Sequence, residues 1–492
     1  MKGLIQTSSA TPRTAPRLVI FLAIAITLLV GAHLAYSFPE QVPKWKIPAA
    51  LKEGETPDHP FEDTEQQILA EFDEAPVSKP LLPCQKLPGG EDVVVVMRTG
   101  ATEIRDKLPV HLKTTLQCYN DYVLMSDYAE EFEGEQVHDL LAGVDDRVKD
   151  THPDFELYRR LRENGRDTLD GSELSGAVSQ DSGAIGKIDN QGWRLDKWKF
   201  LPMALRTMEL RPEKKWYVFV EPDTYLVWSN LLDWLKKLDP EEPAYYGSEV
   251  QIGEDVFAHG GSAFVVSNPG LKRVADMYQQ EPDPWHDLTS IHWAGDCILG
   301  KALLETGTPL TWSWPMFQGG NPQTMDYKED KGDARRLWCA PAMSYHHLSP
   351  SEIQDMFNFE QQWLRQTVNG RQRTSKPVSH RQRERLRLHH QDVFRHYVLP
   401  NVTQQRMDWN NASPDLRAGT QNATLDDCRI MCERDATCVQ YSKTDMGCYF
   451  SNEAKMGQSA EGVQSGWLEE RVQAWADGHQ LCERKASRWV VT

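Results

Sequence analysis

The chain has 492 residues, 40% hydrophobic and 26% charged, with a formal net charge of −18. This length predicts about two to four domains, and the composition excludes a wholly disordered, collagen-like or coiled-coil chain. The excess of 72 acidic over 54 basic residues argues against nucleic acid as the main partner.

The first predicted element is an apolar run, residues 18–36, which contains no Asp, Glu, Lys or Arg. At 1.5 Å per residue a helix of this length is about 29 Å long, enough for the hydrocarbon core of a membrane. Three basic residues and no acidic one precede it, so residues 1–17 are expected in the cytosol. We expect a single-pass type II signal anchor; a cleaved signal peptide is the alternative.

Residues 37–82 are rich in Pro and acidic side chains, which predicts an extended stem. Three glycosylation sequons cluster farther along, at Asn401, Asn411 and Asn422. The nine Cys residues can pair in an oxidising lumen. Together these features predict a protein of the secretory pathway whose bulk is lumenal or extracellular.

A β-branched run at residues 93–97 predicts a strand buried on both faces. A helix is expected over 103–118, followed by a second strand over 122–125 that ends at Ser126-Asp127. Strand, helix and strand in this order begin a parallel α/β sheet. The next expected elements are helices over 193–210, over 230–238 and from 269, and strands over 216–220, 244–246 and 263–266.

The strand at 216–220 delivers two carboxylates, Glu221 and Asp223, into a polar turn. Ligands of α/β sheets bind at the carboxyl ends of strands, so these side chains are candidate ligands for a divalent cation. Mn²⁺ or Mg²⁺, which accept oxygen ligands, would bridge from them to a diphosphate. A helix N-cap at Asp223 or Thr224 is the alternative interpretation.

Six segments in order along residues 97–350 carry further motifs: MRTGATEIRDKLPVHLKTTLQC (97–118), WRLDKWKFLPM (193–203), EPDTY (221–225), HGGSAFVVS (259–267), GDCILGKAL (295–303) and YHHLSP (345–350). The series resembles glycosyltransferase family 31, which contains the core 1 β1,3-galactosyltransferases and the Fringe-type enzymes. The resemblance implies a GT-A-like catalytic domain with a single Rossmann-type mixed sheet. It also implies inverting transfer of a hexose, galactose by this resemblance, from a UDP-sugar.

By the same resemblance Asp296 is the catalytic base, and Asp223 binds Mn²⁺ or Mg²⁺ together with His346 or His347, the choice between the two remaining open. An inverting transferase needs a carboxylate to accept the proton of the attacking hydroxyl and a cation to neutralise the leaving diphosphate. For Asp296 the alternative role is a helix N-cap. The candidate donor-binding residues are Thr99, Arg105, Asp127, Lys197 and Glu221.

The candidate acceptor-side residues are Gly260, Gly261, Trp312 and Trp314. For these Trp residues, and for Trp285 and Trp293 nearby, core packing is the alternative to stacking on a sugar.

Two positions depart from the family's pattern. Pro222 replaces the middle one of three consecutive acids, and Gly295 stands where an acid often precedes the base.

The C-terminal part is Cys-dense, and TLDDCRIMCERDATCVQYSKTDMGCYFS, residues 424–451, resembles a PAN/apple module with a central helix followed by strands. The resemblance implies the pairs Cys432–Cys438 and Cys428–Cys448. A zinc site is the alternative for such Cys spacing, but the lumen favours disulfides. Cys84 with Cys118 and Cys297 with Cys339 are further plausible pairs, which leaves Cys482 unassigned.

The sequence therefore predicts a catalytic domain over 83–403 with a basic segment at 371–403, a linker over 404–415 and a PAN/apple-like module over 416–492. The expected partners are a UDP-sugar donor, a glycan or glycoprotein acceptor, and a Golgi membrane reached through one N-terminal helix; oligomerisation is left open. A non-catalytic carbohydrate- or protein-binding protein on a degenerate transferase fold is the main alternative, and an adhesion protein led by the C-terminal module is another.

Overall fold

The computed structural model describes residues 81–175, 190–328, 336–372, 387–402, 405–478, 482 and 489–490. These residues belong to one compact unit, Lys79–Thr492. The expected anchor at 18–36, nearly all of the stem and the centre of the basic segment lie outside the described residues. None of the helices in the described part of the chain is long and apolar enough to cross a membrane.

A mixed eight-stranded sheet, in the order β11-β7-β10-β5-β1-β2-β4-β3, organises the larger part of this unit, so the prediction of a mixed α/β fold is confirmed. Its centre is β1 (Val93–Arg98), which pairs in parallel with β2 (Tyr122–Ser126) and β5 (Trp216–Val220). All residues of β1 and β5 are buried, as their apolar composition predicts. β10 (Phe264–Ser267) runs antiparallel to its neighbours β5 and β7 (Tyr245–Gly247).

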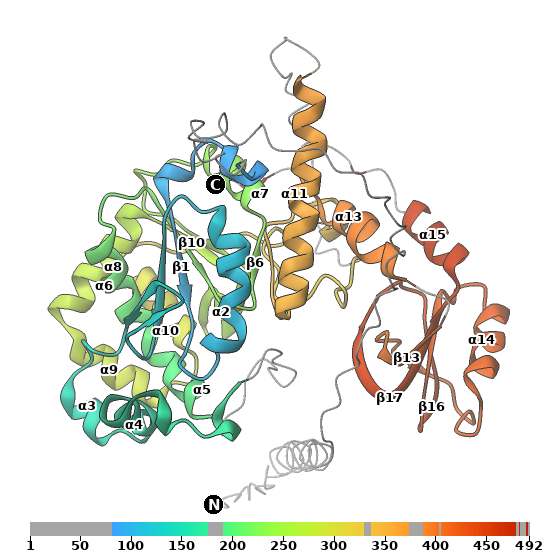
Figure 1. The fold of residues 1–492 in the computed structure, drawn as a ribbon, viewed down its shortest axis with the longest axis horizontal. Helices are drawn as coiled ribbons and strands as arrows, with labels where there is room; N and C mark the ends of the chain where they lie inside the picture. Colours follow the sequence, from blue (N-terminus) through green and yellow to red (C-terminus); the bar gives the residue numbers. More distant parts are fainter. Residues whose placement is uncertain are drawn as a thin grey trace, which may run out of the picture. The chain divides into compact units, whose positions relative to one another are not determined.

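Because side chains alternate along a strand, β1 has two buried faces. Val95 belongs to the hydrophobic cluster that contains α2 (Ile104–Lys113), and Val96 belongs to the cluster on the opposite face (Figure 1). The helices of that opposite face include α6 (Phe200–Leu210), α8 (Asn268–Gln280) and α10 (Gly295–Glu305).

The remaining elements of this region are short. The strands are β3 (Glu130–Phe132), β4 (Glu135–Asp139), β6 (Tyr225–Leu226), β8 (Glu249–Ile252), β9 (Asp255–Ala258), β11 (Leu310–Trp312) and β12 (Ser344–Tyr345). The helices are α3 (Asp146–Thr151), α4 (Glu156–Asn164), α5 (Gln191–Asp196), α7 (Trp228–Leu235), α9 (Pro282–Ile291), α11 (Pro350–Gln372) and α13 (His390–Val393).

Three predicted helices differ from the structure in their extent. The helix expected over 230–238 begins and ends earlier, as α7 (Trp228–Leu235). The helix expected over 103–118 ends at Lys113, where Thr114 leaves the helical conformation and a 3₁₀ turn follows. The helix expected over 193–210 is divided into α5 and α6 by a 3₁₀ turn, Lys197–Lys199. The β3–β4 hairpin was not predicted, because its polar residues lack the apolar alternation that identifies a strand.

The C-terminal part forms a five-stranded antiparallel sheet in the order β13-β17-β15-β16-β14. β13 (Gln405–Asn410) pairs with β17 (Gln458–Trp467), so the prediction of a linker over 404–415 is wrong: this segment supplies an edge strand. The other elements are β14 (Asp415–Leu416), α14 (Leu425–Arg434), β15 (Gln440–Thr444), β16 (Gly447–Ser451) and α15 (Glu469–Gly478).

Three of the four expected disulfides are present: Cys84–Cys118, Cys428–Cys448 and Cys432–Cys438. The fourth prediction, Cys297 with Cys339, is wrong, since Cys339 pairs with Cys482 and Cys297 is a buried free thiol. The reason is packing: Cys297 lies in a small cluster with Phe257, whereas Cys339 belongs to the cluster that also contains α2.

The three sequons differ in accessibility. Asn401 and Asn422 are exposed, but Asn411 is fully buried. The Asn411 amide Nδ2 donates to the carbonyls of Tyr441 (3.0 Å) and Gly466 (3.3 Å). The fold has no room for a glycan on Asn411, so the prediction of a glycosylation site there is wrong for the folded chain.

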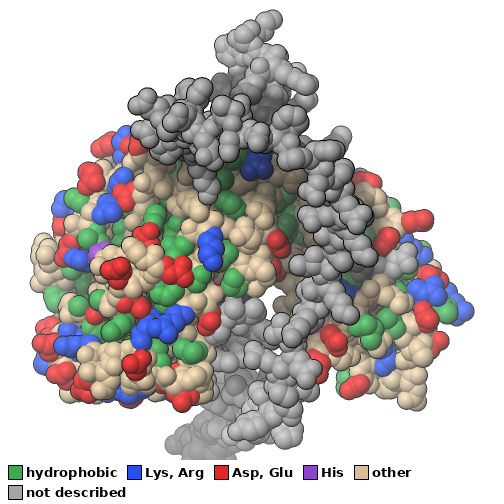
Figure 2. Space-filling view, viewed as in Figure 1, with side chains coloured by type: hydrophobic (Ala, Val, Ile, Leu, Met, Phe, Trp, Pro, Cys, Tyr) green, Lys and Arg blue, Asp and Glu red, His purple; other side chains and the backbone are tan. Residues whose placement is uncertain are grey.

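The face shown in Figure 2 carries acidic and basic side chains in close mixture. Exposed pairs of this kind include Lys272 with Asp276 at 2.7 Å and Arg206 with Glu209 at 2.8 Å. Surface pairs contribute about 0–1 kcal/mol each, so these pairs add little to the free energy of unfolding.

The Cys339–Cys482 bond spans 143 positions and yields a direct test. Peptide mapping of the unreduced full chain is expected to recover a Cys339–Cys482 peptide and to find Cys297 alkylated only after unfolding. Replacing Cys482 by Ser is expected to lower the free energy of unfolding by about 2–5 kcal/mol, because the cross-link closes a long loop. A linked Cys297–Cys339 peptide would contradict the assignment.

Candidate metal and catalytic site

The site is built around the carboxyl end of β5. The β1–β5 register places Met97 beside Val220, so the next residues, Arg98 and Glu221, meet and form an ion pair. Two positions beyond Glu221, Asp223 is 7% exposed. The backbone carbonyl of Asp223 accepts a hydrogen bond from the backbone N–H of Leu348 at 3.0 Å. This bond joins the acidic turn, residues 221–223, to the segment after β12.

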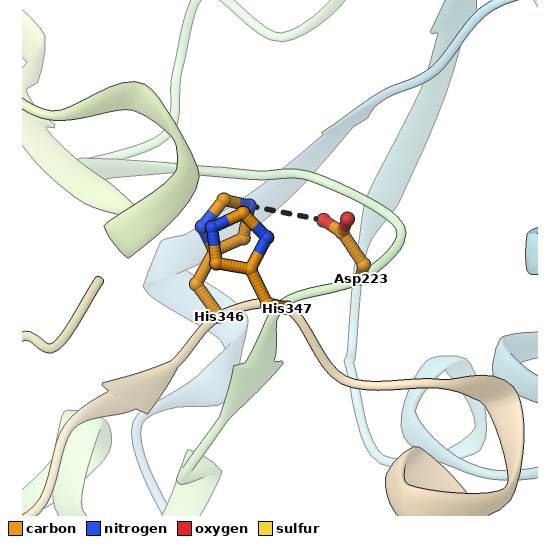
Figure 3. Close-up of side chains that lie close together, drawn as sticks. All are labelled: Asp223, His346 and His347. Atoms are coloured by element: carbon orange, nitrogen blue, oxygen red, sulfur yellow. Dashed lines mark ion pairs between the residues drawn. The ribbon is translucent and has the colours of Figure 1, made fainter. Parts of the chain in front are cut away.

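Asp223, His346 and His347 form a cluster in which one ligand atom from each residue lies within 4.8 Å of the others (Figure 3). The antiparallel pairing of β12 with β6 sets Tyr345 opposite Tyr225, which brings the following His346 next to the acidic turn. His346 Nε2 lies 3.1 Å from Asp223 Oδ1 and 3.4 Å from Glu221 Oε2.

Both His side chains reach this cluster because His347 has a left-handed backbone, with φ of 60°. In an extended strand, consecutive side chains point to opposite faces. The positive φ breaks that alternation, and the two imidazole centroids lie 3.8 Å apart. Left-handed backbone is uncommon for residues other than Gly, and such strain is typical of functional sites.

Gly261 provides the space that the His346 ring occupies. A Cβ atom on Gly261 would lie 2.2 Å from His346 Cε1 and 2.5 Å from Nε2. The Gly261 carbonyl also accepts from the Thr224 hydroxyl at 2.7 Å, which ties the loop before β10 to the acidic turn. Only Gly allows this close approach at position 261.

Two buried cations that the sequence did not single out complete the electrostatics. The Arg98 guanidinium pairs with Asp196 and Glu221, and the Lys107 ammonium lies 3.2 Å from Asp223 Oδ2 and 2.9 Å from Glu103 Oε2. The signal for Lys107 was its place four residues after Glu103 on one helix face.

The paired charges shift the pKa values of this cluster. Burial opposes ionisation of Glu221, but Arg98 and His346 outweigh it and lower its pKa to about 2. The pKa of Asp223 is also held below its ordinary value, since His346 and Lys107 outweigh burial. Burial lowers the pKa of His346, yet Asp223 and Glu221 prevail and raise it to about 10. Without a metal, the His346 imidazolium therefore supplies positive charge to both carboxylates.

The donor set fits a divalent cation that accepts both nitrogen and oxygen. Neighbouring ligands of an octahedral ion with bonds of about 2.1 Å lie about 3 Å apart, close to the 3.1 Å between His346 Nε2 and Asp223 Oδ1. Asp223 Oδ1 is buried, and among the described residues it meets His346 Nε2 as an ion pair and not as a well-aligned hydrogen bond. Imidazole nitrogen favours a first-row transition metal over Mg²⁺, which prefers oxygen, and the carboxylate is a ligand that Mn²⁺ also accepts.

Asp296 lies near the Arg98–Glu221 pair, since a Cβ atom on Gly260 would be 3.5 Å from both Arg98 Nη2 and Asp296 Oδ2. Its Oδ2 accepts from the backbone N–H of Gly260 at 3.0 Å and its Oδ1 from that of Cys297 at 2.9 Å. Burial raises the pKa of Asp296 to about 6, against these hydrogen bonds and the charge of Arg98. This carboxylate is ionised at neutral pH and more basic than an ordinary Asp.

The absence of a side chain at position 295 has a steric reason. A Cβ on Gly295 would lie 2.4 Å from Phe200 Cδ2 and 2.6 Å from the Cα of Lys197. The first turn of α10 packs directly on the 3₁₀ turn between α5 and α6, and no acid fits before Asp296.

Several predicted donor-binding residues do not face the cluster. Asp127 is buried, and its carboxylate pairs with Lys199 at 2.8 Å and accepts from the Ala101 N–H at 2.8 Å. It supports the turn after β1 that contains buried Thr99, and a donor contact by Asp127 stays a prediction. Lys197 pairs with Asp154 at 2.9 Å.

Arg105 is exposed on α2, since residues two apart on a helix point in different directions. Lys107 takes the position toward the acidic turn instead.

Of the predicted acceptor-side residues, the two Gly residues lie at the site and Trp314 lies in the core. Gly260 and Gly261 lie at the site through their contacts with Asp296 and His346. Trp314 is buried in the core and lies against Trp312, with ring centroids 6.1 Å apart, so sugar stacking by Trp314 is contradicted. Trp293, three residues before Asp296, is 45% exposed.

Two further His residues were missed. His111 Nε2 lies 2.8 Å from the Pro222 carbonyl, and burial lowers the pKa of His111 to about 4, so a neutral ring donates to the acidic turn. His259 packs edge-on against His346 at 5.6 Å, and its Nδ1 lies 2.7 Å from the Ser262 hydroxyl.

The chain matches no family model. The chemical capacity of the site therefore rests on its geometry: a nitrogen–oxygen metal cluster, fixed cations and a separate basic carboxylate.

Gly261 gives a specific test of the metal cluster. Its replacement by Ala is expected to rotate the His346 ring away from Asp223 and to weaken Mn²⁺ binding by about 10- to 100-fold. The thermal unfolding midpoint of the metal-free chain should fall as well, because the displaced His346 ring no longer compensates the buried charge of Asp223. Isothermal calorimetry with MnCl₂ measures the effect.

Gly143→Ala is the matched control, since nothing lies within 4 Å of a Cβ at that exposed position. Equal Mn²⁺ affinity in both variants would contradict the assigned role of Gly261.

Proposed function

We propose that this protein is an inverting, metal-dependent glycosyltransferase with a GT-A-like catalytic domain. It transfers a hexose, galactose by the family 31 resemblance, from a UDP-sugar to a glycan acceptor. The observation that carries the proposal is the Asp223–His346–His347 cluster at the carboxyl end of β5, with the basic carboxylate of Asp296 nearby. The motif order along residues 97–350 supports it.

In the proposed reaction the acceptor hydroxyl oxygen attacks the anomeric carbon as the bond from that carbon to the diphosphate breaks. The diphosphate leaves with the bonding electron pair, and Asp296 takes the hydroxyl proton. A single displacement of this kind inverts the anomeric centre.

The other residues hold the site in place. Asp223, His346 and His347 would hold Mn²⁺, which when bound neutralises charge on the leaving diphosphate. Arg98 holds Glu221 through their ion pair, and the Gly260 N–H orients the Asp296 carboxylate.

The proposed setting is the Golgi lumen, with the chain anchored through residues 18–36. This part of the proposal rests on the apolar run, the sequons and the Cys content. The four disulfides support an oxidising compartment. The C-terminal sheet, with two of these bonds, is proposed to be the PAN/apple-like module and to bind protein or carbohydrate.

A donor screen with the full chain in mild detergent tests the activity. UDP release with Mn²⁺ and a panel of glycan acceptors is expected for one UDP-hexose and to be lost in Asp223→Ala. Calorimetry should show that this variant also loses Mn²⁺-dependent UDP binding.

Metal-dependent UDP binding without transfer to any acceptor would favour the non-catalytic alternative, which Pro222 motivates. UDP binding with the same affinity in the presence and absence of Mn²⁺ would contradict the metal site itself.

The role of Asp296 predicts a pH profile. A base with a pKa of about 6 loses its charge as the pH falls, so kcat/KM should decline below about pH 6. Asp296→Asn is expected to lower kcat by about 10²- to 10⁴-fold, since the amide cannot accept the proton. The exposed variant Asp276→Asn is the control. Full turnover by Asp296→Asn would exclude this residue as the base.

A further inference from the structure

The Lys107 ammonium is the closest fixed cation to the proposed metal ligands. Its Nζ lies 3.2 Å from Asp223 Oδ2 and 2.9 Å from Glu103 Oε2, and the residue is only 3% exposed. Glu103 and Lys107 are four residues apart at the start of α2, so the helix holds the ammonium in place.

Because of this contact, the two oxygens of the Asp223 carboxylate have different partners. Oδ1 faces His346 Nε2 at 3.1 Å, while Oδ2 faces Lys107. A cation bound between Asp223 and His346 therefore meets a carboxylate whose second oxygen already has a charged partner. Lys107 likewise occupies Glu103 Oε2, which is otherwise a potential oxygen ligand.

We propose that Lys107 determines which divalent cation the site accepts. By holding Asp223 Oδ2 it limits Asp223 to ligation through one oxygen, and this restriction disfavours Ca²⁺ relative to Mn²⁺. Ca²⁺ takes about six to eight oxygen ligands and often binds both oxygens of a carboxylate. Mn²⁺ is a smaller first-row transition-metal ion that is typically octahedral, and it accepts imidazole nitrogen more readily than Ca²⁺, whose ligands are oxygens. The inference rests on the metal cluster of the proposed function, and it adds the selectivity of that cluster for Mn²⁺ over Ca²⁺.

The test is calorimetry of the full chain with CaCl₂ and with MnCl₂, in the absence of nucleotide. Lys107→Met should raise the ratio of Ca²⁺ to Mn²⁺ affinity by about tenfold, because two carboxylate oxygens become available to the larger ion. Lys107→Arg, which keeps the cation, should leave the ratio near that of the wild type. Lys301→Met removes a similar ion pair, with Asp255 at 2.7 Å, and is the matched control.

Removing Lys107 takes a cation away from the buried carboxylate of Asp223 and from the half-buried carboxylate of Glu103, which can destabilise the chain. The double variant Lys107→Met with Glu103→Gln removes the surplus charge and should still show the raised ratio through Asp223 Oδ2. If the folded variants had an unchanged ratio of Ca²⁺ to Mn²⁺ affinity, the selectivity role of Lys107 would be overturned, while the metal site itself would stand. If the wild type bound neither ion, the metal site of the proposed function would fall with it.

Discussion

The buried carboxylate of Asp223 is the constraint on which the rest of the site depends. A carboxylate withdrawn from water costs several kcal/mol unless opposite charge and hydrogen bonds compensate. Compensation comes from Lys107 on α2 and from His346 after β12, and the Lys107 contact bridges 116 positions in sequence. Compensating the charge of Asp223 therefore brings α2, the end of β5 and the segment after β12 into contact. At this point a divalent cation can replace the proton of the His346 imidazolium.

Close backbone approach is the second physical condition for this site. Gly261 lets the His346 ring pass over the loop before β10, and Gly295 lets the start of α10 rest on the turn that contains Lys197. Neither approach leaves room for a Cβ atom. The metal cluster and the Asp296 carboxylate are thus positioned by contacts between backbone segments as much as by side-chain hydrogen bonds.

The central strands could be predicted because Val93–Arg98 and Trp216–Val220 are continuous apolar runs, and burial on both faces demands that composition. Asp223, His346 and Asp296 could be predicted through motif order. Lys107 could not, because a Glu–Lys pair on a helix is ordinarily a solvated surface pair. Cys482 had no partner in the sequence pattern, since disulfide pairing depends on which segments pack together.

The sequence by itself determined the mixed α/β character, the main strands, the oxidised Cys-rich C-terminal part and the residue types of the candidate site, because these follow from local composition and short spacings. Only the tertiary structure decided that Asp127 supports a turn, that Trp314 is core and that Asn411 is buried. It also decided that both His346 and His347 approach Asp223. Each of these depends on contacts between distant segments, which local pattern does not encode.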